Sequence, residues 1–126
     1  MISMTIRTRT FVATLVLAIA AAVTISAHMA YSKSMPEEDA TVTESPDHLQ
    51  VWFTQAPEPA VSRLSLEGPG GEVELSETTV GDEKSIVAAV PSTLGPGSYT
   101  VNWRSAGDDG HVMRGDFSFT IRAAND

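Results

Sequence analysis

Hydrophobic residues return at every second position in several short stretches of this chain, and no stretch after residue 27 shows a helical period. The alternation is clearest at residues 49–54, 99–104 and 117–122, and shorter runs occur at 61–67, 73–75 and 86–90. Strands that bury one face show this period of two. Glycine and proline separate the runs, as they do at turns. The pattern predicts an all-β chain folded as an antiparallel β-sandwich of about seven strands.

A Leu-Gly-Pro-Gly-Ser-Tyr segment, residues 94–99, leads into one of these predicted strands. A tyrosine at such a turn resembles the tyrosine corner of immunoglobulin-like sandwiches, in which the phenol hydroxyl bonds back to upstream backbone. The alternative is that Tyr99 is an ordinary core residue. Both interpretations give the same immunoglobulin-like fold class.

The first 27 residues have the features of a secretory signal peptide. Arg7 and Arg9 precede an apolar run that ends near Val23, and a short polar segment follows. The alternative is an uncleaved N-terminal membrane anchor, but the run is shorter than the roughly 20 apolar residues of a membrane span. Cleavage after Ala27 would make His28 the first residue, whereas cleavage after Ala22 fits the small-x-small rule better. We therefore divide the chain into a signal peptide, residues 1–27, and one domain, residues 28–126, and expect export to the periplasm.

The remaining domain is acidic and contains no cysteine. Loss of residues 1–27 takes away two arginines and no acidic residue, which moves the formal net charge from −8 to −10. Nucleic acids and anionic membranes need basic surfaces, so we expect neither as a partner, and no stable membrane insertion after cleavage. Without thiolates, zinc sites of the cysteine type and iron–sulfur clusters are excluded.

The residues that could carry chemistry are two of the three histidines and one aspartate. Asp109 and His111 are separated by one glycine, in a loop between two predicted strands. One carboxylate and one imidazole make half of a tetragonal Cu(II) or Ni(II) site. Asp-Gly-His is also a common turn composition, so a solvated turn is the alternative. His48, at the start of a predicted strand, is interpreted as a surface residue and not as a ligand.

His28 completes the set if it becomes the N-terminus. Its α-amine and its imidazole can then chelate one metal ion, because the amine has a pKa near 8 and copper competes with the proton. Together with Asp109 and His111 this gives three nitrogens and one oxygen, a donor set that suits square-planar Cu(II).

Four segments resemble the CopC family of periplasmic copper-binding proteins. Residues 28–36 are similar to the family's opening, an N-terminal His followed by Ser-x-Pro, and residues 49–54 to its first long strand. Residues 94–104 resemble its Leu-x-x-Gly-x-Tyr-x-Val-x-Trp-Arg strand, and residues 105–115 its Asp-x-His-x-x-x-Gly loop. The proline that usually follows the loop histidine is Val112 here.

The resemblance implies a Greek-key β-sandwich and a Cu(II) site formed by His28, Asp109 and His111, with one copper ion per chain. It favours cleavage after Ala27. It also implies a copper carrier or buffer in copper resistance or homeostasis, which could pass copper to an inner-membrane transport protein. We expect a monomer that is not an enzyme. Residues 56–90 contain no methionine, so a methionine-rich Cu(I) site is not expected.

Two other functions compete with the copper carrier. Polysaccharide monooxygenases use an N-terminal histidine and a second histidine on a similar sandwich, but Asp109 would occupy a copper position that such enzymes use for oxygen. A metal-free immunoglobulin-like module of the cell envelope is the other alternative. It predicts that copper affinity does not depend on His111.

Overall fold

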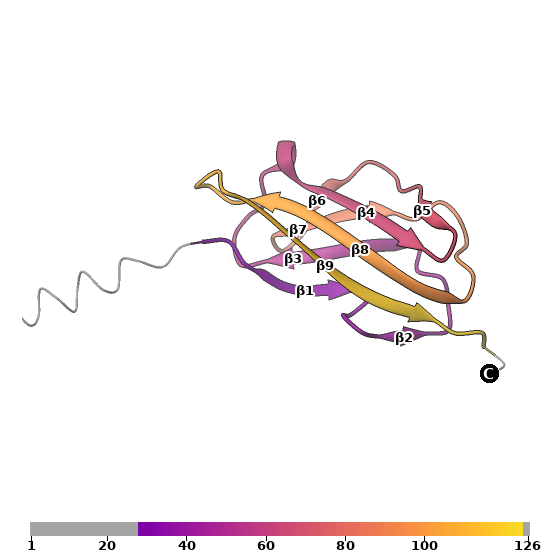
Figure 1. The fold of residues 1–126 in the computed structure, drawn as a ribbon. Coiled ribbons are helices and arrows are strands. Elements are labelled where there is room, and N and C mark those ends of the chain that lie inside the picture. Colours follow the sequence, from indigo (N-terminus) through magenta and orange to yellow (C-terminus); the bar gives the residue numbers. More distant parts are fainter. Residues whose placement is uncertain (1–27, 125–126) are drawn as a thin grey trace, which may run out of the picture.

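The computed structural model describes residues 28–124, and the predicted signal peptide lies outside the described residues. This part of the chain forms two packed β-sheets (Figure 1). The first sheet has four strands in the order β1 (Tyr31–Met35), β3 (His48–Phe53), β7 (Ser85–Ala89), β6 (Thr79–Gly81). The second has five, in the order β2 (Thr41–Val42), β9 (Val112–Ile121), β8 (Gly97–Ala106), β4 (Arg63–Gly68), β5 (Gly71–Val73).

The predicted all-β sandwich is confirmed. Over the described residues it has nine strands where the sequence indicated about seven, and one 3₁₀ turn, η1 (Pro59–Val61). Neighbouring strands are antiparallel, except that β2 runs parallel to the end of β9. Within residues 28–124 no helix is long and apolar enough to cross a membrane.

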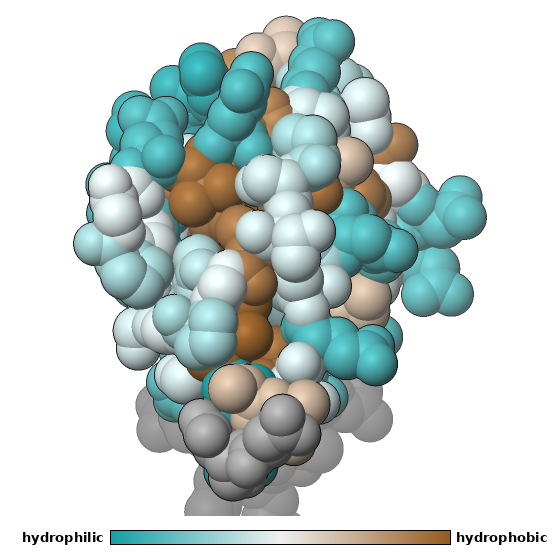
Figure 2. All heavy atoms as spheres, turned by 90° about the vertical axis from the view of Figure 1, so that its right-hand side faces the viewer, coloured by the Kyte–Doolittle hydropathy of each residue, from teal (hydrophilic) through white to brown (hydrophobic). Residues whose placement is uncertain are grey.

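The core lies between the two sheets and follows the period of two. On β3, Leu49, Val51 and Phe53 are at most 3% exposed, while the residues between them are half-buried. Val101 on β8 and Phe119 on β9 close the core from the other sheet. Figure 2 views one end of the sandwich, where a strip of hydrophobic residues runs between polar ones. The alternating side chains therefore bury one face of each sheet. This burial of apolar surface is the main driving force for the fold.

Tyr99 forms the tyrosine corner that its sequence context indicated. Its hydroxyl donates a hydrogen bond of 2.7 Å to the carbonyl of Gly95, four residues upstream. Its ring stacks on Phe119 with 5.5 Å between the ring centroids. Tyr99 thus packs in the core with its ring and, through its hydroxyl, holds the turn that leads into β8.

The longest hairpin, β8–β9, determines where the candidate site lies. Its strands pair without interruption from Gly97↔Ile121 to Ala106↔Val112. The loop of residues 107–111 therefore projects at one end of the sandwich, and the start of β1 lies at the same end (Figure 1). Figure 2 shows the opposite end.

Candidate metal centre

His28 stands at the surface beside a buried anchor. Met29, the next residue, is 2% exposed and belongs to the core cluster. The backbone of Ala30 is tied on both sides to Thr54: its N–H donates to the Thr54 hydroxyl, and its carbonyl accepts from the Thr54 N–H, both at 2.9 Å. His28 is therefore held one residue away from a fixed part of the sandwich.

The loop of residues 107–111 folds as a tight turn that presents Asp109 and His111. The Gly110 N–H donates to the Gly107 carbonyl at 3.1 Å. Gly110 has φ of +75°, a backbone conformation that residues with a side chain rarely adopt, so glycine suits this position. The His111 N–H donates to Oδ1 of Asp109 at 3.1 Å, which orients the carboxylate and leaves Oδ2 for contacts with other groups.

A second glycine brings the loop close to His28. A Cβ at Gly107 would lie 3.2 Å from Cβ of Met29 and 2.7 Å from Oε1 of Gln55. The end of the Gln55 side chain can move aside, but a larger residue at position 107 would also require a small shift of Met29, the residue next to His28. The sequence pattern did not indicate this role of Gly107, or the anchoring role of Met29, because both depend on contacts between distant segments.

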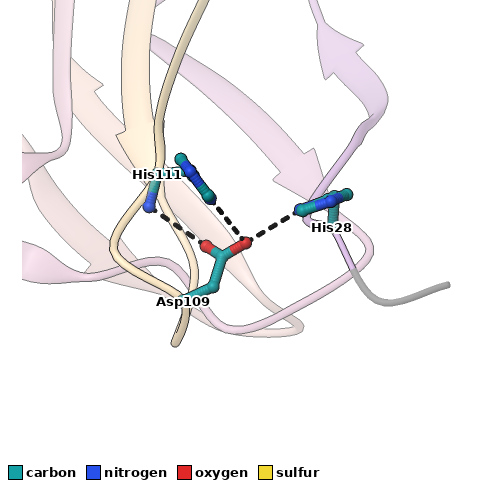
Figure 3. Close-up of side chains that lie close together, drawn as sticks. All are labelled: His28, Asp109 and His111. Atoms are coloured by element: carbon teal, nitrogen blue, oxygen red, sulfur yellow. Dashed lines mark hydrogen bonds and ion pairs between the residues drawn. The ribbon is translucent and has the colours of Figure 1, made fainter. Parts of the chain in front are cut away.

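The structure brings together the three residues that the sequence singled out, across 81 positions of the chain. Oδ2 of Asp109 lies 2.9 Å from Nδ1 of His28 and 3.2 Å from Nδ1 of His111 (Figure 3). The two imidazole rings meet edge to face, with 5.7 Å between centroids. One ligand atom from each residue can be chosen so that all three lie within 4.8 Å of one another. That spacing is compatible with three ligands around one ion.

The electrostatics favour a cation at this point. The hydrogen bond with His28, then the His111 N–H and the His111 side chain, lower the pKa of Asp109 from 3.8 to about 2. The carboxylate is therefore ionised at neutral pH. Both imidazoles are open to solvent, with side chains 72% and 76% exposed, whereas that of Asp109 is 31% exposed. An ion can thus reach a negatively charged oxygen flanked by two nitrogen donors.

The lowered pKa of Asp109 predicts a pH-dependent contribution to stability. A carboxylate with a depressed native pKa contributes fully above its unfolded value of 3.8, and the contribution is lost as the pH falls toward 2. We expect the free energy of unfolding of the metal-free protein to fall more steeply between pH 4 and pH 2 than that of Asp109→Asn. Urea titrations over that range measure the difference. Asp108→Asn is the control, and an equal slope in all three proteins would contradict the prediction.

A hollow of about 430 Å³ opens at the candidate site. It is lined by the three candidate ligands together with Met29 and Met113. Met113 is half-buried and packs against the core cluster at the edge of the loop. Val112 follows His111 in place of the usual proline, and the side chains of His111 and Asp109 are still in contact, with 3.2 Å between Nδ1 and Oδ2.

His48 lies away from this centre. It starts β3 and pairs with Ala89, whereas the other end of β3 pairs with Tyr31, near His28. Its Nδ1 is 2.6 Å from Oδ1 of Asp47. Among residues 28–124, the group formed by His28, Asp109 and His111 is the one cluster of histidine and acidic residues with metal-ligand spacing.

Comparisons with known proteins agree with the fold. The chain is 28% identical over 122 residues to copper resistance protein C of Xanthomonas campestris pv. juglandis, which covers 88% of this chain and 95% of that protein. The structure of this chain is similar to that of PcoC, a methionine-rich copper resistance protein from Escherichia coli. The TM-score is 0.69 and the identity 28%, and the match covers 76% of this chain and all of that chain.

A second similar structure is CopC from Methylosinus trichosporium OB3b, with a TM-score of 0.70, 25% identity, and coverage of 79% of this chain and 98% of that one. The CopC domain itself matches residues 31–122, which include every strand of both sheets and two of the three candidate ligands. The chain therefore belongs to the CopC domain family.

Proposed function

We propose that this protein is an exported copper-binding protein that holds one Cu(II) ion with His28, Asp109 and His111, and serves as a copper carrier or buffer. The observation that carries the proposal is the meeting of these three side chains, with Oδ2 of Asp109 facing Nδ1 of both histidines. Relatives in the same family are named copper resistance proteins, which supports copper as the cargo.

The donor set favours Cu(II) over harder and softer ions. Imidazole nitrogens and one carboxylate oxygen suit Cu(II), whereas Mg²⁺ and Ca²⁺ prefer sites made only of oxygen. Cleavage after Ala27 would add the α-amine of His28. The amine nitrogen and Nδ1 of the same residue can close a six-membered ring with a metal ion. Three nitrogens and one oxygen then match the four positions of a square-planar site.

Transport needs a fixed ligand set and no catalytic step. The ligands stand on the β8–β9 loop and beside the buried Met29, so the sandwich preorganises them. Asp109, between the two imidazoles, would fill one of the positions that a copper monooxygenase keeps for oxygen. We therefore propose a periplasmic, non-catalytic monomer that passes copper to a membrane transport protein.

Intact-mass spectrometry of the exported protein, with and without one equivalent of Cu(II), tests this proposal. A mass that corresponds to a chain beginning at His28, and that increases by one copper, supports both the cleavage site and the stoichiometry. A mass that corresponds to a chain beginning at Val23 would mean that His28 has no free α-amine, which contradicts the proposed set of three nitrogens and one oxygen. Oxidised oligosaccharides, formed when the copper-loaded protein is mixed with chitin, oxygen and a reductant, would favour the enzyme instead.

A further inference from the structure

Three arginines lie side by side on the outer face of the five-stranded sheet. Arg63 on β4 pairs directly with Arg104 on β8, and Arg104 pairs directly with Arg114 on β9. They face outward, because their neighbours Leu64 and Trp103 are buried on the inner face. Neighbouring strands are about 4.8 Å apart, so the three side chains start within about 10 Å of one another. We call these residues the arginine row.

No acidic side chain forms an ion pair with the arginine row in the described part of the chain. The ion pairs within 4 Å there involve histidines only. The Nε–H of Arg104 donates to the carbonyl of Val61 at 3.3 Å, which fixes the central arginine. Asp116 lines the same hollow without pairing with an arginine. Like charges placed directly opposite one another on a sheet are destabilising, so an anionic partner would offset a cost that the sequence accepts.

The hollow beside the row has further groups suited to carboxylates. It measures about 430 Å³ and includes Ser65 and Asn102, the neutral pair two residues along the same strands. Guanidinium groups bind carboxylates through two parallel N–H···O bonds. The surface thus offers both charge and directed donors to an acidic partner.

The charge of the row is opposite to that of the rest of the domain. Beyond residue 27 the sequence has six basic residues against 16 acidic ones, and the arginine row holds three of the six. A basic patch on an acidic molecule orients an approaching acidic surface, because most of the other charged groups are acidic and repel it.

The row also lies next to the candidate metal centre. Arg104 and Arg114 are two positions from Ala106↔Val112, the pair that closes the loop of Asp109 and His111. At about 3.3 Å per residue, that is about 7 Å along the hairpin. A protein surface that covers the row therefore reaches the metal loop as well, whereas a small anion in the hollow would not.

We propose that the arginine row docks an acidic surface of the protein that exchanges copper with this one. The role in copper exchange rests on the proposed function, while the docking of an acidic surface does not. In this assignment the arginines make the docking contact and position the partner over the loop that carries the copper ligands.

A short poly-glutamate peptide, titrated into full-length mature protein, probes the row. The Nε–H signals of the arginines in NMR spectra report which side chains are contacted. We expect Arg63→Gln/Arg104→Gln/Arg114→Gln to lower peptide affinity about tenfold, and the binding to weaken with salt. The matched control, Lys33→Gln/Lys84→Gln/Arg122→Gln, removes the same charge elsewhere, and we expect a change below about twofold. Equal losses in both variants would overturn the proposal.

Three further arms keep the result interpretable. Because Arg104 also bonds to Val61, the double variant Arg63→Gln/Arg114→Gln, at exposed positions, tests the row without touching that bond. Citrate that binds as tightly as the peptide would overturn the proposal in favour of a small-anion site. Self-association of the unmodified protein that disappears in the triple variant would also overturn it, because the occupant of the row would then be a second copy of this chain. Cu(II) binding by the triple variant, measured separately by electron paramagnetic resonance, distinguishes failure of docking from failure of the copper site.

Discussion

Replacing His111 by alanine is expected to lower the affinity for Cu(II) by about 100-fold or more. Mutating groups that merely support a metal ligand typically costs about 10- to 100-fold, and His111 would be a ligand itself. Its side chain is 76% exposed, so its removal leaves the core intact. Asp109→Ala is expected to lose as much. It removes the carboxylate oxygen and also the group that faces both imidazoles.

Competition titrations with a chelator of known copper affinity measure this loss. His48→Ala is the matched control, because His48 also has an aspartate within hydrogen-bond distance but lies near the other end of the sandwich. We expect its copper affinity to match that of the unmodified protein. Unchanged affinity in His111→Ala would support a metal-free envelope module and contradict the copper carrier.

The central strands could be predicted from the sequence because they are buried on one face only. Residues 49–54 and 117–122 alternate clearly, and they correspond to β3 and the second half of β9. The strands that the pattern did not show are β1, β2 and β6. They lie at sheet edges, and β1 and β6 bury one residue and none, respectively, so their sequences carry no alternation to detect.

The ligands of the site could be named from the sequence, but the contacts that join them could not. The Asp-x-His spacing and an N-terminal histidine are local features. Their meeting depends on the register of β8 with β9 and on the approach of Gly107 to Met29, which link distant segments. The arginine row was not predicted for the same reason, since it exists only through the pairing of three strands.

Acetylating the α-amine of His28 is expected to weaken Cu(II) binding by about 10- to 100-fold while leaving every side-chain ligand in place. The acetyl group converts the α-amine into an amide, whose nitrogen is not basic at neutral pH, and it brings no other amine, so the chelate ring on His28 cannot form in the same way. The imidazole of His28 remains and can still approach Asp109, as it does at 2.9 Å when residue 27 precedes it.

Electron paramagnetic resonance of the copper-loaded protein distinguishes the two donor sets, because the nitrogen hyperfine pattern changes when a nitrogen ligand is lost. The protein that carries one acetyl group on Lys33 instead is the control, since it has the same added mass and a free amine on His28. If acetylation of the amine left both affinity and spectrum unchanged, the amine would not be a ligand. The site would then consist of side chains alone, and it would not depend on where the signal peptide is cut.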